Sequence, residues 1–473
     1  MISSDADRWV GDVLVVGAGP GGMAAAHEAA TAGLKVLLID ENQRAGGQIN
    51  RQRFLSSQDD SKRGIPSLES GFHPNICFRA GTICHGFRDD SSVVLSTKAG
   101  LLIAQPRAVV LATGAVEKVL PVPGWTLSGV MTVGAAQSYL KGSGVFPYRR
   151  VLVAGTGPLL LAAAAQLHKA GVQVVGVVEA ARPGPLQFLD AARLLSGPSL
   201  LAQGGQYLAV LAKAGIRPQV GVGVRRIAGD RQVSGVWLSR LRTDWSLVDA
   251  PAKFVACDAV LLSYGFSSAT ELASQAGAKI EWDKQRETWR PTRDENFRTT
   301  VEHVYAVGDC AGVGGARIAE LEGQIAGIML SAELAGSKGT PRRLRRCRRK
   351  LAHLEVFRIG MDNLFRPGSG ASSWQDPTTQ VCRCQGSTRA DIDAALDDGV
   401  KDLASLKLWT RAGMGDCQGR TCALQLAAIL SSRGHPEDGL MPPTTRFPVR
   451  PLHIDLLCRL TESTADAAPH EGA

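Results

Sequence analysis

Four cysteines near the C-terminal end have the residue type and spacing to bind a metal centre. Cys382 and Cys384 form a C-x-C pair, and Cys417 and Cys422 form a C-x4-C pair after a gap of 32 residues. Four thiolates are enough to hold one [2Fe–2S] cluster or one zinc ion. Structural zinc sites usually use C-x2–4-C pairs, so the C-x-C half favours the iron–sulfur cluster. Zinc and a metal-free set of thiols are the alternatives.

A glycine-rich turn near the N-terminus has the pattern of a dinucleotide-binding site. It reads G-x-G-x-x-G, and its predicted binding residues are Gly17, Gly19, Pro20 and Gly22. The three glycines would allow a tight turn, close approach of the backbone to a pyrophosphate, and close packing of a helix on a strand. The helix after the turn would direct free N–H groups at the phosphates.

This turn lies within a complete βαβ unit. The sequence predicts a strand over 12–16, a helix over 23–32 and a second strand over 35–39. Asp40 and Glu41 follow the second strand, where an acidic side chain accepts hydrogen bonds from an adenosine ribose. The unit predicts a dinucleotide site but does not by itself distinguish FAD from NAD.

Two segments after this unit favour FAD. Gly47 and Gln48 lie in a loop that looks like the G-G-Q segment that lines the flavin in two-dinucleotide flavoproteins. A buried strand over 108–112 ends in Thr113 and Gly114, the A-T-G signature of the same class. The order of these segments predicts that the first unit binds FAD.

A third segment, much later in the chain, completes the predicted flavin site. Residues 304–307 predict a strand that ends in Gly308 and Asp309, and the Asp309 carboxylate would accept a hydrogen bond from a ribityl hydroxyl. Residues 321–323 are expected to start a helix whose N-terminal end faces the flavin. The long separation from the first unit indicates that another domain is inserted between them.

The inserted region contains a second βαβ unit about 138 residues after the first. Its turn has Gly155 and Gly157, but Leu160 occupies the third glycine position and prevents equally close packing of helix on strand. Glu179 ends the second strand and would suit NAD better than NADP. An NAD(P) site, a site for another adenine nucleotide, and a purely architectural role all remain open.

The predicted fold class is α/β: a two-dinucleotide-binding flavoprotein fold, with two nested Rossmann-like domains and a small helical cysteine-ligated module at the C-terminal end. In that module a helix over 388–398 is expected to bury Ala394, Ala395 and Leu396. The expected segments are a discontinuous FAD-binding domain over 1–122 and 290–335, a nested NAD(P)-like domain over 123–289, a linker with a basic helix over 336–378, a [2Fe–2S] module over 379–435, and a C-terminal tail over 436–473.

The charge of the chain leaves its macromolecular partners partly open. The net charge is +9, and seven basic residues lie within 342–350. Such a run can bind nucleic acid or anionic lipid. No nucleic-acid motif accompanies it, so we expect no nucleic acid and interpret the run as a solvated helix face or a patch that docks a partner subunit.

Composition also bears on location. No run of about 20 apolar residues exists, so no transmembrane segment is expected. Residues 1–10 are polar and lack the pattern of a signal peptide. Ten cysteines are too few for a disulfide scaffold. We expect a cytoplasmic protein, with peripheral contact to the inner membrane through its electron acceptor as the alternative.

Across nearly its full length the chain resembles the larger flavoprotein subunit of multi-subunit amine and amino-acid dehydrogenases. This family includes the A-type subunits of octopine and nopaline oxidases, the middle subunit of hydrogen cyanide synthase, and the alpha subunits of D-hydroxyproline and dye-linked proline dehydrogenases. The resemblance rests on residues 116–131, 134–137 and 415–422. The last of these is similar to the [2Fe–2S] module of bacterioferritin-associated ferredoxin.

The resemblance implies FAD, a [2Fe–2S] cluster and a second flavoprotein subunit similar to D-amino-acid oxidase that oxidises the C–N bond. A small ferredoxin-like subunit often completes such complexes. Lys118 stands where relatives often carry Arg, and Leu160 is normal for this branch, which weakens the expectation of NAD. No catalytic residue is predicted; Glu117 and Lys118 are either a flavin-facing pair or surface residues. The resemblance therefore implies an electron-transfer subunit of a dehydrogenase that oxidises an amine, opine, imino acid or amino acid, with electrons passing through the flavin and the cluster to an acceptor. A free-standing NAD(P)H-dependent flavin reductase and a non-catalytic scaffold are the alternative functions.

Overall fold

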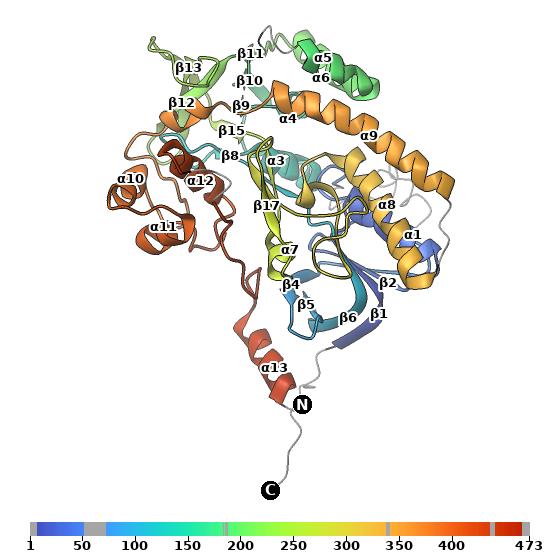
Figure 1. The fold of residues 1–473 in the computed structure, drawn as a ribbon. Helices are drawn as coiled ribbons and strands as arrows, with labels where there is room; N and C mark the ends of the chain where they lie inside the picture. Colours follow the sequence, from blue (N-terminus) through green and yellow to red (C-terminus); the bar gives the residue numbers. More distant parts are fainter. Residues whose placement is uncertain are drawn as a thin grey trace.

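The first glycine turn lies at the carboxyl ends of the parallel strands of a mixed sheet (Figure 1). The computed structural model describes residues 7–51, 72–182, 184, 188–336, 341–435 and 440–465. Strand β1 (Asp7–Val16) pairs in parallel with β2 (Val36–Asp40) and with β6 (Gly100–Leu111), and helix α1 (Pro20–Thr31) connects β1 to β2. The apolar residues of β1 and β2 are buried on both faces of the sheet, one face against α1 and α8 (Ala316–Ala335) and the other in a second hydrophobic core. The predicted βαβ unit is confirmed.

The rest of this seven-stranded sheet comes from distant parts of the chain. Its order is β3-β2-β1-β6-β5-β4, with β19 beside the end of β6. The added strands are β3 (Ile76–Ala80), β4 (Ile83–Phe87), β5 (Val93–Thr97) and β19 (Val304–Ala306). Strand β19 returns the chain from the nested domain, as the sequence predicts. We call this sheet and its helices the flavin lobe.

Helix α8 (Ala316–Ala335) packs directly on α1. A Cβ atom at Gly323 would lie 2.0 Å from the carbonyl oxygen of Gly21, so the two backbones approach too closely for any side chain at this contact. The prediction that a helix begins at 321–323 is wrong, because α8 begins at Ala316. Gly323 serves the α1–α8 contact inside the helix and does not mark its start.

The nested domain contains a second parallel sheet, in the order β11-β10-β9-β15-β8. Its strands are β8 (Val130–Thr132), β9 (Arg150–Gly155), β10 (Gln173–Glu179), β11 (Gln219–Val220) and β15 (Ala259–Ser263). Its helices are α3 (Val133–Ser138), α4 (Leu159–Lys169), α5 (Phe188–Arg193) and α6 (Pro198–Lys213), with a π-helical turn over Tyr139–Ser143 after α3 and a 3-10 turn over Leu194–Ser196 after α5. A three-stranded antiparallel sheet covers one side: β12 (Val222–Gly229), β13 (Val233–Arg240) and β14 (Lys253–Ala256).

The two lobes are connected by two short antiparallel strands, β7 (Ala115–Glu117) and β16 (Phe266–Ser268). Two further elements complete the flavin lobe: α7 (Glu271–Gln275) and the hairpin of β17 (Ile280–Asp283) with β18 (Thr288–Pro291). A 3-10 turn over Gly308–Ala311 follows β19.

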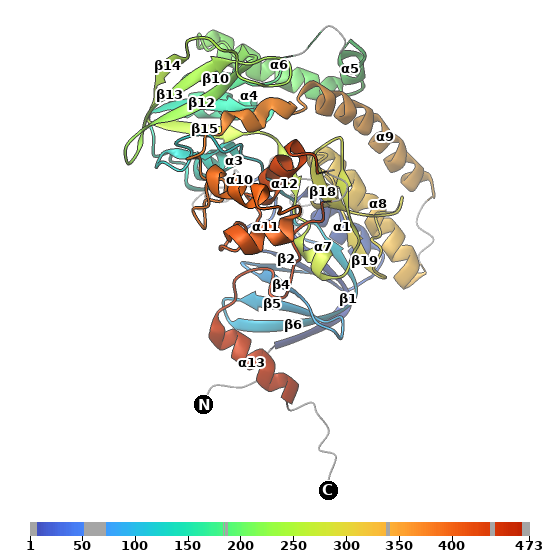
Figure 2. The same ribbon diagram turned by 60° about the vertical axis from the view of Figure 1, so that its left-hand side comes forward.

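Helix α9 (Pro341–Leu364) occupies most of the predicted linker and is a packed element. Cys347 and Leu351 are buried against α8, whereas the second half of the helix contacts α5. Figures 1 and 2 show α9 along the outside of the molecule, where it spans both lobes. After it, a 3-10 turn over Ser369–Trp374 buries Trp374 in the core of the nested domain.

The cysteine module is a small helical bundle. Its helices are α10 (Arg389–Asp397), α11 (Leu403–Thr410) and α12 (Ala423–Ser432). Thr388 and Asp391 form a capping box that starts α10, and Asp402 caps α11. The expected inner face of α10 needs correction, because Ile392 and Ala395 are buried and Ala394 is exposed.

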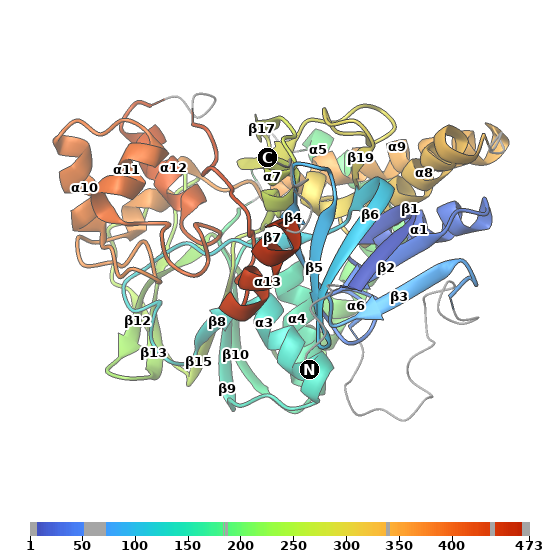
Figure 3. The same cartoon turned by 90° about the horizontal axis from the view of Figure 1, so that it is seen from below.

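The module lies to one side of the β1–β6 sheet (Figure 3). A last helix, α13 (Ile454–Ala465), packs Leu460 against β5 and β6. Over the described ranges, no helix combines the length and the apolar character needed to cross a membrane.

Candidate cofactor sites

The glycine turn between β1 and α1 leaves one backbone position open. Gly17 has φ +107°, and a Cβ atom there would lie 2.3 Å from the carbonyl oxygen of Ala112. A Cβ atom at Gly22 would lie 1.9 Å from the carbonyl oxygen of Gly17. A Cβ atom at Gly19 would meet no atom closer than 3.9 Å, and Pro20 follows at the first position of α1. Two glycines therefore serve packing, and the third presents accessible backbone at the helix N-terminus.

Asp40 closes this turn from the end of β2. The side chain is only 8% exposed, and its two oxygens accept hydrogen bonds from the N–H groups of Ala18 and Asn42, each at 2.8 Å. The Glu41 side chain points away from the glycine turn. Its carboxylate lies 3.5 Å from the guanidinium of Arg450 and is half-exposed. The structure thus brings Asp40, and not Glu41, to the glycine turn.

The predicted G-G-Q loop lies against the same turn. The N–H group of Gly46 donates to the carbonyl of Ala18 at 2.8 Å, and a Cβ atom at Gly47 would lie 3.0 Å from the Cα of Gly19. Gln48 lies beside α3, where its side-chain oxygen accepts a hydrogen bond from Ser138 at 3.4 Å. Gly47 therefore borders the opening at Gly19, and Gln48 extends toward the nested domain.

The remaining predicted flavin contacts surround the ends of β6 and β19. Thr113 donates a hydrogen bond to the carbonyl of Ala269 at 3.3 Å. Gly114 follows with φ +77°, and a Cβ atom there would have no neighbour within 4 Å. Asp309 accepts hydrogen bonds from the N–H groups of Gly314 and Gly315, at 2.9 and 2.8 Å. These bonds orient one carboxylate oxygen of Asp309 at the turn that precedes α8.

A buried ion pair supports this turn, and sequence reasoning missed it. Arg293 binds both carboxylate oxygens of Glu322, at 2.7 and 2.8 Å, and the same carboxylate accepts the N–H of Gly308 at 2.7 Å. Glu322 is 2% exposed. The available signal was an acidic residue directly before Gly323, on the helix that follows the Gly308–Asp309 turn. The pair fixes the start of the Gly308–Asp309 turn.

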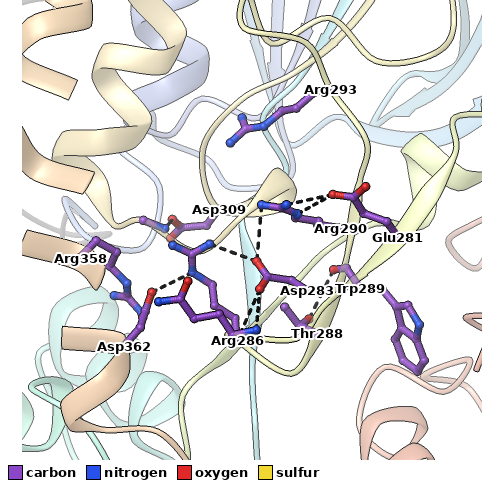
Figure 4. A network of polar contacts seen from close by, with 12 residues as sticks. Glu281, Asp283, Arg286, Thr288, Trp289, Arg290, Arg293, Asp309, Arg358 and Asp362 are labelled. Carbon is purple, nitrogen blue, oxygen red and sulfur yellow. Dashed lines mark hydrogen bonds and ion pairs between the residues drawn. The ribbon is translucent and has the colours of Figure 1, made fainter. Parts of the chain in front are cut away.

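A second network of arginines and carboxylates joins the β17–β18 hairpin to α9, and Arg293 lies outside it (Figure 4). Arg286 binds Asp283 at 3.1 Å within the β17–β18 hairpin and Asp362 of α9 at 3.0 Å. Arg358 also binds Asp362. Since Asp362 is 9% exposed, the network anchors the hairpin to the long helix in a poorly hydrated region.

Glu117 and Lys118 are not a surface pair. Lys118 Nζ donates hydrogen bonds to the carbonyls of Arg286 and Glu287 at 2.7 and 2.8 Å, and burial lowers the pKa of Lys118 to about 8. Glu117 accepts the N–H of Gly134 at 2.7 Å, and burial raises its pKa. Both side chains therefore bind protein backbone and hold the connecting strand β7 in place.

At the second glycine turn, between β9 and α4, an acidic side chain accepts backbone N–H groups as Asp40 does at the first turn. The carboxylate of Glu179 accepts the N–H groups of Gly157 and Ala181 at 2.9 and 2.8 Å, and burial raises its pKa to about 7. The chain after α9 crosses this turn, because the hydroxyl of Thr156 donates to the carbonyl of Phe365 at 3.4 Å. Leu160 is fully buried at the third glycine position.

The four predicted cysteine ligands form two thiol pairs. Hydrogen bonds between side chains join Cys382 to Cys422 and Cys384 to Cys417. Cys382 and Cys422 are buried, Cys417 is partly exposed and Cys384 is exposed. Within the described ranges, no three His, Cys, Asp or Glu side chains are already arranged as ligands of one metal ion. The structure therefore brings the four thiols together in pairs.

The surroundings of the buried pair suit thiolates. The pKa of Cys382 is lowered to about 5, chiefly because the Cys422 thiol donates a hydrogen bond to its sulfur. Backbone N–H groups of Gly413, Gln385 and Cys384 also point at this sulfur and lower its pKa. Such N–H groups stabilise sulfur ligands and tune the potential of iron–sulfur clusters. The donor set, four thiols with oriented N–H groups, fits a [2Fe–2S] cluster.

The hairpin β17–β18 connects the module to the flavin lobe. Trp289 is buried in the same core as Cys382 and Cys422, and its indole N–H donates to the carbonyl of Leu440 at 3.0 Å. Trp282 contacts Trp289 edge to face, with ring centroids 5.2 Å apart. One hairpin thus reaches from the arginine network into the core that carries two of the cysteines.

Comparison with known proteins extends over both parts. Residues 11–330 match the pyridine nucleotide-disulphide oxidoreductase family, and residues 380–432 match the BFD-like [2Fe-2S] binding domain. The A-type subunit of opine oxidase from Agrobacterium tumefaciens (strain Ach5) is 35% identical, covering 95% of this chain and 92% of the relative. Hydrogen cyanide synthase subunit HcnB of Pseudomonas protegens is 33% identical, covering 93% and 96%.

A solved structure supports the fold. L-proline dehydrogenase from P. horikoshii superposes with a TM-score of 0.71, covering 96% of this chain and 80% of that chain, at 21% identity. The predicted resemblance, the two-dinucleotide α/β fold and the two cofactors, FAD and [2Fe–2S], are confirmed. The chain belongs to the family of oxidoreductase flavoprotein subunits that includes HcnB and the A-type subunits of opine oxidases, with a [2Fe–2S]-binding domain at its C-terminal end.

Proposed function

We propose that this chain is the FAD-containing electron-transfer subunit of a multi-subunit dehydrogenase that oxidises an amine, opine, imino acid or amino acid. Its relatives carry the names of opine oxidase and sarcosine oxidase subunits, whose substrates have C–N bonds. When bound, the flavin accepts electron pairs and releases single electrons, and the cluster carries one electron at a time. The observation that carries the proposal is the β17–β18 hairpin, which packs Trp289 from the flavin lobe into the cysteine module.

The residues of this chain bind and position the two cofactors. Backbone at Gly19 and the N-terminus of α1 would hold the pyrophosphate, together with Gly17, Pro20 and Gly22. Asp40 would accept hydrogen bonds from the ribose. Further contacts would come from Gly47, Gln48, Thr113, Gly114, Gly308 and Asp309, and the four thiolates of Cys382, Cys384, Cys417 and Cys422 would hold the iron. We also propose the domain boundaries given above, with the FAD-binding domain interrupted at 122 and resumed at 290.

The proposed partner subunits are inferred from the relatives in the same family. The names of the relatives mark them as subunits. We propose that a second flavoprotein subunit, similar to D-amino-acid oxidase, oxidises the substrate, and that a small ferredoxin-like subunit can join the complex. In this arrangement no general acid or base is required of the present chain, because its side chains do not contact the substrate.

A second function retains support from the nested domain. The turn at Gly157 and the carboxylate of Glu179 keep the layout of a nucleotide site, so a free-standing NAD(P)H-dependent flavin reductase is the competing proposal. Leu160 and the chain at Phe365 occupy positions that favour the electron-transfer subunit, since they fill space near this turn.

Anaerobic spectroscopy of the purified protein separates the two functions. If the chain is an electron-transfer subunit, we expect flavin absorption bands, about two irons and two sulfides per chain, and no bleaching of the flavin by NADH. Bleaching by NADH would support the reductase. A preparation with zinc in place of iron would overturn the electron-transfer proposal. Co-purification of a second flavoprotein with the complex isolated from its native host would support the proposal that this chain is one subunit of a complex.

A further inference from the structure

A single side chain of the second cysteine loop contacts three separate parts of the molecule. Arg420 lies between Cys417 and Cys422, two of the four predicted ligands. Its Nη1 donates to the carbonyl of Cys417 at 3.3 Å, and its backbone N–H donates to the same carbonyl at 3.1 Å. The guanidinium therefore folds back onto the backbone of a predicted cluster ligand.

The flavin lobe holds the other nitrogens of this guanidinium. The Nε atom of Arg420 lies 2.6 Å from a carboxylate oxygen of Glu271, at the start of α7, and the two side chains are only 14% and 23% exposed. Its Nη2 donates to the carbonyl of Val449 at 2.9 Å, in the segment that follows the cysteine module. Val449 is buried in the core of the flavin lobe, where its N–H donates to the carbonyl of His85 on β4 at 2.9 Å. One charged side chain thus joins the cysteine loop to α7 and to the segment bound at β4.

The acidic partner of Arg420 is close to the turn at the end of β6. Ala269, two residues before Glu271, donates its N–H to the carbonyl of Gly114 at 3.2 Å and accepts the Thr113 hydroxyl at 3.3 Å. Thr113 and Gly114 are among the proposed flavin contacts. Gln275, at the other end of α7, forms two hydrogen bonds with the backbone of β4, at 2.7 and 2.8 Å. Glu271 is therefore held between the proposed flavin turn and the sheet behind it.

The residue type suits a junction of this kind. A guanidinium is planar, stays charged and presents five N–H donors in a rigid fork. In Arg420 all three nitrogens donate to acceptors from different parts of the chain. The hydrogen bond to a carboxylate is charge-assisted and stronger than one between neutral groups. A lysine has one nitrogen and cannot reach all three acceptors at once.

We propose that Arg420 is a positioning residue for electron transfer between the two cofactors. With Glu271 it fixes the second cysteine loop, and so the cluster, at a set distance from the flavin turn. The inference rests on the proposed function. In the step concerned, one electron leaves the reduced flavin and enters the oxidised cluster, and no covalent bond forms or breaks between them. Electron transfer becomes slower as the distance between donor and acceptor increases, so a displaced loop slows this step.

The position of the cluster can be measured directly on the holoprotein. In a Cys458→Ser background, Cys77 on β3 is the remaining exposed thiol outside the predicted ligands, among the cysteines that the structure describes. A nitroxide label on Cys77 marks the flavin lobe, and pulsed EPR between this label and the reduced cluster gives their separation. Arg420→Gln and Glu271→Gln should each broaden the distribution of this distance. Pulse radiolysis, in which a radical donor reduces the flavin, should show that transfer to the cluster is about tenfold slower in both variants.

Matched variants control for the loss of an arginine or of an ion pair in general. Arg433→Gln removes an arginine whose ion pairs, with Asp393 and Asp397, lie within the module, and should keep the wild-type distance and rate. Arg420→Lys keeps the charge but not the fork, and its distance and rate should fall between those of the wild type and Arg420→Gln. The double variant Arg420→Gln/Glu271→Gln should be no slower than Arg420→Gln alone, because both substitutions remove the same contact.

Iron content and flavin absorbance of each variant separate cofactor assembly from cofactor position. A wild-type protein without iron or without flavin would remove the proposed function, and this inference with it. Wild-type cofactor content, distance and rate in Arg420→Gln and Glu271→Gln would overturn only the role of Arg420. Equal changes in Arg433→Gln, or additive effects in the double variant, would also overturn that role. If Arg420→Gln does not assemble the cluster, Glu271→Gln decides the result, since its side chain lies outside the cysteine module.

Discussion

Arg293 and Glu322 form a two-point ion pair inside the flavin lobe, with N–O distances of 2.7 and 2.8 Å. The two residues come from the segment after β18 and from α8, and Glu322 also accepts the N–H of Gly308. The pair therefore joins the incoming chain, the Gly308–Asp309 turn and the helix behind it. A charge buried in this way is costly to leave without its partner.

Replacing Glu322→Gln should destabilise the protein by about 3–5 kcal/mol, because Arg293 would keep a buried charge without a carboxylate. The variant should also retain less FAD after gel filtration, since the Gly308–Asp309 turn loses its anchor. Urea denaturation and flavin absorbance per chain measure the two effects. Arg107→Gln is the matched control: it breaks the exposed pair with Asp12 and should cost about 1 kcal/mol or less. Equal losses in both variants would contradict the prediction.

Replacing Cys384→Ser should lower the iron and sulfide content of the purified protein while FAD is retained. Serine cannot supply a thiolate, and the cysteine module has its own core, separate from that of the flavin lobe. Iron analysis and the visible spectrum after subtraction of the flavin bands give the result. Cys77→Ser changes an exposed thiol on β3 and should leave iron unchanged. Unaltered iron in Cys384→Ser would exclude this residue as a ligand.

The buried carboxyl of Glu179 should make stability fall as pH rises. Burial raises its folded-state pKa from 4.5 to about 7, so the folded protein holds the proton more tightly than the unfolded chain does. Stability from this group is complete below about pH 4.5 and is lost as pH rises through about 7; the full shift corresponds to about 3 kcal/mol. Urea denaturation at pH 5 and pH 8, compared between wild type and Glu179→Gln, measures it.

The variant cannot ionise at this position, so its stability should vary less between the two pH values. Other buried carboxylates contribute equally to both proteins and cancel in the comparison. Glu302→Gln, at a side chain that is 84% exposed, should keep the wild-type dependence. A Glu179→Gln variant with the full wild-type dependence would show that another group is responsible.

Replacing Gly323→Ala should push α1 and α8 apart, since the new Cβ atom would lie 2.0 Å from the carbonyl oxygen of Gly21. We expect a loss of about 1–3 kcal/mol in the free energy of unfolding and weaker FAD retention. Gly204→Ala, inside α6 with no atom within 4 Å of the new Cβ, should instead stabilise by about 0.5–1 kcal/mol. If both substitutions shift stability in the same direction, close helix contact is not the reason for Gly323.

The parts of the molecule that sequence alone predicted depend on local pattern. Gly17 could be assigned to the tight turn and Gly22 to packing, because the order strand, glycine turn, helix already specifies where a side chain would collide. The pairing of the cysteine loops was foreseeable from residue type and spacing, although the division into a buried and an exposed pair was not. The predicted start of α8 was wrong by five residues, because Gly323 lies at a close contact with α1 inside the helix and not at its start.

The sequence by itself determined the two nested βαβ folds, the two cofactors and the family, since these depend on short segments with strong local preferences. Tertiary structure alone decided that Arg293 binds Glu322, that Lys118 binds the carbonyls of Arg286 and Glu287, and that Trp289 enters the cysteine module. Each of these contacts joins elements that are distant in sequence or separate in the fold. Their energies depend on burial and on partner geometry, which residue spacing does not specify.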